Sequence, residues 1–368
     1  MKAPQTTRLA QSLPASVPFV GPETQERARG KKFAARLGAN ESVFGPSPRA
    51  IHAMEKAASE VWMYGDAQSH DLRHALADKH GVAPDNILVG EGIDGLLGYA
   101  VRLFVEQDDI VVTSAGAYPT LNYHVAGFGG KIEAVPYMGD HEDPKALAAK
   151  AHEVGAKIVY IANPDNPMGT WHYDEMIIEM IEALPEGCLL ILDEAYIEFA
   201  PHGTAPAIDV TNLQVIRMRT FSKAYGMAGA RIGYAIGHAD IIENFHKIRN
   251  HFGLSRISQD GALAALKDEE YLRETLDNVS TARETIYEIA RANGLEAIPS
   301  ATNFVTIDCG QDGDFARRVL AELLARDIFV RMPFVAPQDR CIRISTAPQD
   351  DVALFAKALP LALKAART

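Results

Sequence analysis

The sequence contains little cysteine and no long apolar run. Its three cysteines, Cys188, Cys309 and Cys341, are odd in number and far apart, which argues against a disulfide framework and indicates a reducing compartment. The longest purely aliphatic stretches, such as residues 189–192, are much shorter than the roughly 20 residues of a membrane-spanning helix. Residues 1–20 contain no continuous apolar segment of the kind found in secretory signals. We therefore expect a cytoplasmic protein without a membrane-spanning segment.

Positive charge is in deficit. The chain has 36 Lys and Arg against 48 Asp and Glu, a net charge of −12. This balance argues against a sequence-independent grip on nucleic acid or on an anionic membrane, so we expect neither as a partner. The apolar share of 47% and the charged share of 23% in 368 residues are ordinary for a globular protein of about two domains.

Short apolar segments alternate with helical periodicity from about Ser47 onward. This alternation predicts an α/β fold: a large three-layer α/β/α domain whose buried, mostly parallel sheet has helices on both faces. The expected strands are 86–89, 110–114, 131–136, 158–162, 188–192 and 215–219. One expected helix starts at Ser47-Pro48. Four others are expected at 93–105, 118–127, 144–153 and 173–184.

The pattern changes from Gly261 onward and predicts a smaller α+β domain. We expect a long helical region at 261–293, strands at 304–307, 328–330 and 341–344, and helices at 314–325 and 350–366. The expected division is an N-terminal arm with part of the small domain (1–46), the large domain (47–257) and the small C-terminal domain (258–368).

A glycine-rich string between a predicted strand and helix, Gly90–Gly95, matches G-x-G-x-x-G, the dinucleotide-binding fingerprint. That fingerprint also needs an acidic residue at the end of the next strand, where this chain has Ser114-Ala115-Gly116. A nicotinamide site is therefore disfavoured. A helix start that offers backbone N–H groups to a phosphate remains open, as does a tight turn without a ligand.

Two histidines, His70 and His74, have the spacing of a helical zinc pair. A zinc metalloprotease would have Glu directly after the first histidine, and this chain has Asp71. The spacing suggests no third ligand, so we predict no metal site.

Polar residues follow two of the predicted strands directly. Asp193 begins Asp193-Glu194-Ala195-Tyr196 after the strand at 188–192, and ligand contacts in such sheets gather at the carboxyl ends of strands. An Asp there can hold a cationic group, or it can cap a helix. The turn 163–169, Asn-Pro-Asp-Asn-Pro-Met-Gly, follows another strand, so its Asn166 can enter the same crevice.

Lys223 lies between hydroxyl residues in Thr220-Phe221-Ser222-Lys223, and Arg231 follows eight positions later. A lone loop lysine is usually a solvated charge. A lysine beside hydroxyls, small residues and an arginine instead indicates a Schiff-base amine next to an anion pocket. Partial burial and a nearby cation would lower the pKa of this amine.

These motifs, N-P-x-N-P-x-G at 163–169, D-E-A-Y at 193–196 and T-F-S-K at 220–223 with its later Arg231, together resemble the fold-type I pyridoxal-phosphate aminotransferases of class I/II. The similarity covers nearly the whole chain and is greatest to the histidinol-phosphate aminotransferase branch. It implies the PLP-dependent transferase fold, with pyridoxal 5'-phosphate bound in the large domain. It also implies amino transfer between an anionic amine, either histidinol phosphate or an amino acid that can be aromatic, and a 2-oxo acid such as 2-oxoglutarate.

The resemblance also assigns roles to residues. Lys223 would form the Schiff base and act as the general base, and Asp193 would keep the ring nitrogen protonated. Tyr196 and Asn166 would hydrogen-bond the phenolic oxygen of the ring, and Tyr118 would stack on its face. The residues expected to hold the cofactor phosphate are Gly92, Ile93, Asp94, Thr220, Ser222 and Arg231.

The same resemblance implies a homodimer with shared active sites, because Tyr64 matches the tyrosine that reaches the neighbouring subunit's cofactor. Arg343 would grip the anionic group of the substrate, with Arg331 as a second such arginine. Asn40 lies in the stretch that covers the substrate. The alternative for Arg343 is an exposed charge on a strand of the small domain.

The chain departs from the family pattern at Gly65, Ile93 and Met168. We expect cofactor binding to survive, because Ile93 still offers its backbone N–H. Gly65 and Met168 are expected nearer the partner chain and the substrate, where they bear on substrate identity. A decarboxylase or lyase similar to threonine-phosphate decarboxylases, and a non-catalytic metabolite sensor, remain as alternatives. Whether phosphate or carboxylate binds Arg343 also stays open.

Overall fold

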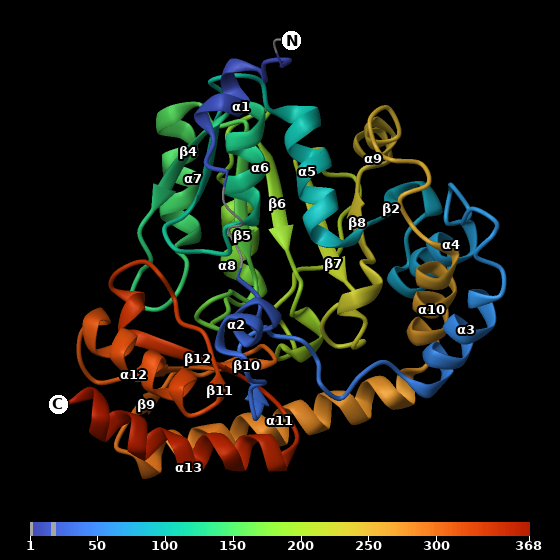
Figure 1. Ribbon diagram of the computed structural model, residues 1–368. Helices are drawn as coiled ribbons and strands as arrows, with labels where there is room; N and C mark the ends of the chain where they lie inside the picture. Colours follow the sequence, from blue (N-terminus) through green and yellow to red (C-terminus); the bar gives the residue numbers. More distant parts are fainter. Residues whose placement is uncertain (1–2, 16–19) are drawn as a thin grey trace.

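A seven-stranded sheet lies at the centre of the computed structural model, which describes residues 3–15 and 20–368 (Figure 1). Its strand order is β2-β8-β7-β6-β5-β3-β4. Neighbours from β7 to β4 are parallel, whereas β8 runs antiparallel to both β7 and β2. The strands are β2 (Ile87–Gly90), β3 (Ile110–Ser114), β4 (Lys131–Val135), β5 (Ile158–Ala162), β6 (Leu189–Asp193), β7 (Val215–Thr220) and β8 (Gly233–Gly237).

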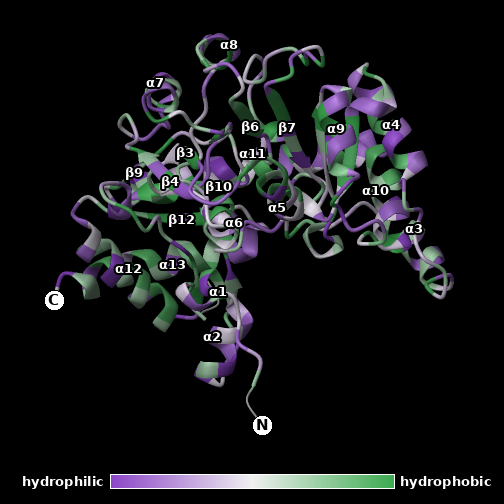
Figure 2. Cartoon of the chain, turned by 90° about the horizontal axis from the view of Figure 1, so that it is seen from above, coloured by the Kyte–Doolittle hydropathy of each residue, from purple (hydrophilic) through white to green (hydrophobic). Residues whose placement is uncertain are grey.

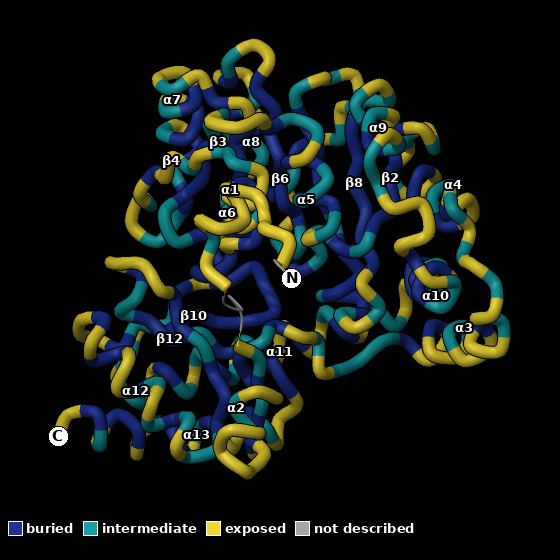
Figure 3. Tube along the Cα trace, turned by 45° about the horizontal axis from the view of Figure 1, so that its top comes forward, coloured by how far each residue is buried: buried dark blue, intermediate teal, exposed yellow. Residues whose placement is uncertain are grey.

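Helices cover both faces of this sheet (Figures 1 and 3). They are α3 (Pro48–Ala58), α4 (His70–His80), α5 (Gly92–Phe104), α6 (Thr120–Phe128), α7 (Pro144–Val154), α8 (Asp174–Glu182), α9 (Ala239–Phe245) and α10 (Arg256–Leu266). On β5, Ile158 and Tyr160 pack with α5 and α6, while Val159 and Ile161 pack with α7 and α8. Because successive side chains of a strand alternate between faces, an apolar strand needs a layer on each side. The predicted three-layer α/β/α architecture is confirmed.

Local sequence sets the limits of these helices. Ser47 caps α3 by accepting a hydrogen bond from the backbone N–H of Ala50, and Asp143 caps α7 by accepting one from Ala146. Gly155 ends α7 in the left-handed conformation, with φ of 63°, which costs glycine little. The strands that these helices flank are hydrophobic in Figure 2 and buried in Figure 3.

A smaller unit lies below the carboxyl ends of the parallel strands and is orange to red in Figure 1. Its elements are α11 (Glu269–Ala292), β9 (Glu296–Ala297), β10 (Phe304–Asp308), α12 (Gly313–Ala325), β11 (Ile328–Phe329), β12 (Cys341–Ser345) and α13 (Gln349–Ala366). β10 pairs antiparallel with both β9 and β12. This is the α+β arrangement expected beyond Gly261.

The N-terminal segment contacts both units: its first helix lies against α6 of the large domain, and the chain from residue 22 onward packs on the small unit (Figure 1). It contains α1 (Arg8–Ser12), α2 (Pro22–Arg29) and β1 (Ala35–Arg36), and β1 pairs in parallel with β11. Ala35 and Leu37 share an apolar cluster with Ile286 and Phe355. The parts of the predicted arm at 1–2 and 16–19 lie outside the described residues, and the division at 46 and 257 stays a prediction.

Several elements differ from the prediction, and the short elements α1, α2, β1, α9 and β9 were not predicted at all. The strand β8 was missed, because its apolar core of three residues lies between Gly233 and Gly237. The helix α4 was also missed. The expected single helical region at 261–293 is two helices that separate at Lys267 and Asp268, and the first begins at Arg256. Among the described residues, no helix has the length and apolarity needed to cross a membrane.

Candidate active site

The predicted site residues gather at one edge of the central sheet. Asp193 ends β6, Lys223 lies three residues after β7, and Asn166 lies four residues after β5. Arg231 lies two residues before β8, and the antiparallel direction of β8 brings its amino end to the same edge. A cavity of about 490 Å³ opens here, at the position where sheets of this kind bind ligands.

Most of the predicted residues line this cavity. They are Asn40, Ile93, Asp94, Tyr118, Asn166, Asp193, Tyr196, Thr220, Ser222, Lys223, Arg231, Arg331 and Arg343. Gly92 lies directly behind it with φ of +79°, and a Cβ there would come within 2.7 Å of Arg231 Nη2. Tyr64 lies outside the cavity, where it is 77% exposed and its ring centroid is 4.8 Å from that of Phe252.

Lys223 extends its amine into the cavity. Its Nζ donates a hydrogen bond to the backbone carbonyl of Asn40 at 3.0 Å and lies 5.4 Å from the centroid of the Tyr196 ring. Burial lowers the pKa of Lys223 to about 8. About one fifth of the amine is therefore neutral at pH 7.4, far more than for an ordinary lysine, and the neutral form is the one that attacks a carbonyl carbon.

Asp193 is buried at the end of β6. Its Oδ2 accepts a hydrogen bond from the Tyr160 hydroxyl at 2.7 Å, and its Oδ1 accepts one from the backbone N–H of Ala195 at 2.9 Å. Burial raises the pKa of Asp193 to about 6. The next helical turn, Ile197–Phe199, begins only after Tyr196, so Asp193 does not act as a helix cap. Its fixed carboxylate suits a cation bound in the cavity.

Tyr196 and Asn166 form a chain of hydrogen bonds along the cavity wall. The Tyr196 hydroxyl accepts from Asn40 Nδ2 at 3.2 Å and from Asn166 Nδ2 at 3.5 Å. Arg343 Nη1 donates to Asn166 Oδ1. Burial raises the pKa of Tyr196 to about 12, so the hydroxyl stays protonated and can donate to an oxygen in the cavity.

Arg331 and Arg343 lie side by side. Their backbones pair, with Arg343 N donating to Arg331 O at 2.6 Å and Arg331 N donating to Arg343 O at 3.3 Å. The Arg343 guanidinium also donates to Gly38 O at 3.2 Å and lies 5.1 Å from the centroid of Phe304. The Arg343 Nε is buried and, within the described chain, has no hydrogen-bond partner. Arg343 is therefore built into the cavity wall, and the reading as an exposed strand charge is wrong.

These two arginines are poised to bind an anion. Burial lowers the pKa of Arg331, and it lowers that of Arg343 to about 10. The charge of Arg331 adds to this lowering at Arg343. An anion between the two guanidinium groups would relieve both the desolvation and the repulsion.

A second anion cradle lies at the start of α5. Thr220 Oγ1 accepts from Ser222 N at 3.0 Å, and Arg231, in the left-handed conformation with φ of 51°, donates from Nη1 to Ala228 O at 3.0 Å. Asp94 in the first turn of α5 is bound by His124 Nε2 at 3.0 Å, and this hydrogen bond lowers the pKa of Asp94. The exposed guanidinium and the helix N-terminus together favour a phosphate group.

A pair of buried carboxyl groups behind Asn166 was not predicted. Glu142 accepts from Ser114 Oγ at 2.5 Å and from Ala162 N at 3.0 Å. Asp165 accepts from Tyr137 Oη at 2.9 Å and from Met168 N at 3.0 Å. Burial raises the pKa of Glu142 well above its usual value, and that of Asp165 to about 7. These contacts fix the turn that carries Asn166.

The departures at Gly65 and Met168 have structural reasons. A Cβ at Gly65 would lie 2.6 Å from the carbonyl oxygen of Leu254, so no larger residue fits there without movement. Met168 is fully buried against Ile298 and Cys341. The expectation that Met168 lies next to the substrate is wrong, because its side chain packs into this core and does not line the cavity.

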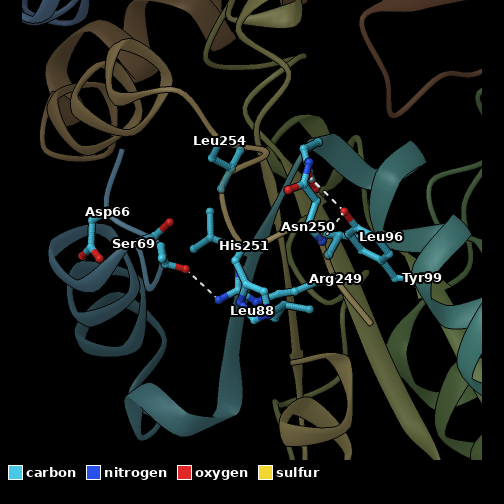
Figure 4. Close-up of a pocket in the computed structure, with 12 residues that line it drawn as sticks. Asp66, Ser69, Leu88, Leu96, Tyr99, Arg249, Asn250, His251 and Leu254 are labelled. Carbon is cyan, nitrogen blue, oxygen red and sulfur yellow. Dashed lines mark hydrogen bonds between the residues drawn. The ribbon is translucent and has the colours of Figure 1, made fainter. Parts of the chain in front are cut away.

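A much smaller crevice lies behind the start of α5 (Figure 4). Arg249 Nη2 donates to Ala67 O at 2.6 Å, and the Tyr99 hydroxyl accepts from Asn250 N at 3.0 Å and donates to Glu91 Oε1 at 3.0 Å. The crevice has a volume of about 10 Å³, which suits about one water molecule. The crevice is therefore too small for a substrate, and the hydrogen bonds around it hold Glu91 and Asn250 in place.

Comparison with known proteins adds sequence and structural relatives. The family described as "Aminotransferase class I and II" matches residues 34–359. Histidinol-phosphate aminotransferase 1 from Nitrosococcus oceani is 33% identical, over 93% of this chain and 92% of its own length. A histidinol-phosphate aminotransferase from Anaeromyxobacter sp. is 34% identical over 88% of each chain. The crystal structure of histidinol-phosphate aminotransferase from Sinorhizobium meliloti in complex with pyridoxal-5'-phosphate is 51% identical, with a TM-score of 0.96 over 99% of this chain and 98% of that one.

Proposed function

The chain belongs to the class I and II aminotransferases and uses pyridoxal phosphate, and we propose that it transfers the amino group of histidinol phosphate to a 2-oxo acid such as 2-oxoglutarate. Family membership makes it an enzyme rather than a non-catalytic sensor. The decarboxylase alternative is not favoured, because the curated relatives at 33% and 34% identity are named as aminotransferases.

The cavity residues fit pyridoxal phosphate in three separate places. The buried amine of Lys223 is available to the aldehyde, and the carboxylate of Asp193 is available to the ring nitrogen. The start of α5, with Arg231 and Thr220, offers N–H groups, a hydroxyl and a positive charge to the phosphate. When bound, the cofactor supplies a ring that accepts electrons from the reacting carbon of the substrate.

Each of these protein groups then has one task in the reaction. Lys223 would hold the cofactor, and its amine would take the proton from the carbon that bears the substrate amine. Asp193 keeps its negative charge next to the ring nitrogen, supported by Tyr160. Tyr196 and Asn166 would donate hydrogen bonds to the cofactor from one wall, and Tyr118, which lines the cavity, would lie against the ring.

Arg331 and Arg343, whose backbones pair and whose side chains both line the cavity, carry the substrate assignment. A phosphate monoester has close to two negative charges near pH 7 and three acceptor oxygens, so it can engage both arginines at once. A carboxylate has one charge and two oxygens. Two neighbouring cations with lowered pKa values therefore favour the phosphate of histidinol phosphate.

We extend the proposal to a cytoplasmic homodimer with shared active sites. Trp62, Tyr64 and Phe252 are 81%, 77% and 56% exposed in the single chain, and aromatic residues of this kind are enriched at subunit interfaces. From there Tyr64 would reach the cofactor phosphate of the partner subunit. The three cysteines are free and buried, as suits a reducing compartment.

A panel of amine donors tests the substrate assignment. We expect kcat/KM with 2-oxoglutarate to be at least tenfold higher for histidinol phosphate than for histidinol, histidine, phenylalanine or aspartate. The Arg331→Gln variant should lose this preference for the phosphate ester over histidinol, because it removes one of two cations. Equal rates for histidinol and its phosphate would refute the assignment, as would a higher rate for an amino acid.

A further inference from the structure

The backbone carbonyl of Asn40 accepts hydrogen bonds from two buried nitrogen donors. Lys223 Nζ donates to it at 3.0 Å, and Asn303 Nδ2, from the residue before β10, donates at 3.1 Å. Asn40 is 2% exposed and Asn303 is fully buried. The carbonyl thus joins the amine of the large unit to an amide of the small unit.

Asn40 itself cannot turn away from these donors. Its backbone N–H donates to Ser345 Oγ at 3.0 Å, its Oδ1 accepts from the same hydroxyl at 3.0 Å, and its Nδ2 donates to the Tyr196 hydroxyl at 3.2 Å. Its φ of 55° lies in the left-handed region, which Asn tolerates better than most residues. Every polar group of Asn40 has a partner, so the direction of its carbonyl is set.

Of the two polar atoms in the Asn303 side chain, one makes a hydrogen bond and the other makes none within the described residues. A carbonyl can only accept, so the nitrogen of the Asn303 side chain must be the atom that faces Asn40. Its Oδ1 is buried and, within the described residues, has no hydrogen-bond partner. A buried acceptor without a partner weakens folding, and leucine of similar shape would avoid this cost. Compared with leucine, an asparagine at this position adds only the N–H donor to the carbonyl of Asn40.

We propose that Asn303 is a positioning residue for amino transfer: it holds the Asn40 carbonyl against the amine of Lys223. With one N–H engaged by that carbonyl, the neutral amine has a defined orientation, and its lone pair points into the cavity to take the substrate proton. This inference rests on the proposed role of Lys223 as the reacting amine.

The amide of Asn303 also affects which form of the amine is preferred. It occupies one of the two acceptor sites of the carbonyl, which leaves less acceptor capacity for a fully protonated ammonium group. Besides burial, the groups that act on Lys223 are Tyr118, Arg343, Glu41 and Asp193. None of them changes when Asn303 is replaced by an apolar residue, so a change in the titration of Lys223 reports on the carbonyl contact.

The test compares Asn303→Leu with the wild-type full-length chain. In protein freed of cofactor, carbamylation of Lys223 by cyanate is followed by peptide mass spectrometry across pH, because cyanate reacts with the neutral amine. We expect the midpoint of the profile to move to higher pH and the rate at pH 7.5 to fall roughly three- to tenfold, the value of one neutral hydrogen bond. In the loaded enzyme, kcat should fall by a similar factor with KM unchanged.

Thr346→Val is the matched control. The Thr346 hydroxyl donates to the backbone carbonyl of Asn303 at 3.0 Å, so this variant loses a buried hydrogen bond at the same place without touching the Asn303 side chain. We expect it to keep the wild-type carbamylation midpoint. Asn303→Leu should melt no lower than Thr346→Val, because it also removes the unpartnered Oδ1.

The outcomes separate the inference from the proposed function. A midpoint and kcat of Asn303→Leu equal to those of Thr346→Val would overturn the role of Asn303. If Asn303→Leu does not fold, Asn303→Ala is measured in the same way and judged by the same criterion. Reduction of the wild-type holoenzyme with borohydride tests Lys223 separately: a cofactor attached elsewhere would refute the proposed function, whatever the Asn303 variants do.

Discussion

Replacing Tyr160 by phenylalanine should weaken cofactor binding in a pH-dependent way. The Tyr160 hydroxyl donates a 2.7 Å hydrogen bond to Oδ2 of Asp193, and the Tyr160→Phe change removes only that oxygen. A hydrogen bond to an ionised acceptor contributes about 1.5–3 kcal/mol, equivalent to roughly 10- to 150-fold in the ionisation equilibrium. The pKa of Asp193, already raised to about 6 by burial, should therefore rise further.

The size of the effect follows from the population of the carboxylate. Because the pKa is raised, the carboxylate predominates only above about pH 6 and is lost as the pH falls. At pH 6 the wild-type Asp193 is about half ionised, and in the variant the ionised share should fall roughly 5- to 75-fold. If the cationic ring nitrogen binds only the carboxylate, the Kd for pyridoxal phosphate at pH 6 should rise by the same factor. At pH 9 the two proteins should differ little.

Equilibrium dialysis of pyridoxal phosphate against the cofactor-free protein, at several pH values, measures the Kd of each variant. The matched control is Tyr234→Phe, since Tyr234 is also buried and its hydroxyl bonds His80 Nε2 at 2.9 Å, away from the cavity. The control should keep the wild-type profile. A uniform loss of affinity at all pH values, or no loss at pH 6, would refute the role given to Tyr160 and Asp193.

Three further changes test other parts of the site. Arg343→Gln should lower kcat/KM for histidinol phosphate at least tenfold, because it removes a charge-assisted hydrogen bond to the substrate anion; steady-state kinetics with an unchanged value would contradict this. Tyr64→Phe should weaken cofactor retention in the dimer, measured by dialysis, and a fully active monomer in sedimentation would contradict the shared site. Glu194→Leu should lower the free energy of unfolding in urea by about 3–5 kcal/mol, because Glu194 is buried and bonds Arg217 and Arg219; wild-type stability would be inconsistent with that network.

The site residues that sequence analysis identified share one property. Asp193, Asn166 and Lys223 each lie within four residues of the carboxyl end of a parallel strand. Their neighbours in the sequence form short motifs, and the topology of the sheet brings strand ends together whatever the details of packing. Their place in the cavity could therefore be predicted from local pattern and chain order.

The supporting residues could not be predicted in this way. Asn303 and Ser345 contact Asn40 from 263 and 305 residues away in the sequence, and Glu142 reaches Ser114 from 28 residues away. Each lies among other polar residues, such as His141, Thr302 and Thr346, and no short motif distinguishes it from them. Only the packing of the small unit against the sheet edge, and of the chain behind Asn166, gives these residues partners.

The strands of the fold also differ in how well local sequence predicts them. Strands with four or five consecutive apolar residues, such as β5 and β6, were predicted within one residue. β8 was missed although its antiparallel pairing with β7 defines the loop that holds Lys223 and Arg231. A strand that begins and ends with glycine has little local preference for the extended state, and its neighbours on either side of the sheet stabilise it.

The most direct test of the central claim is where the cofactor is attached. The purified holoenzyme is reduced with borohydride, digested and analysed by peptide mass spectrometry, with Lys223→Ala treated in parallel. We predict the added mass of a reduced pyridoxal-phosphate adduct on Lys223 alone, and neither adduct nor turnover in the variant. An adduct on another lysine, or normal transamination by Lys223→Ala, would contradict the claim that this buried amine carries the chemistry.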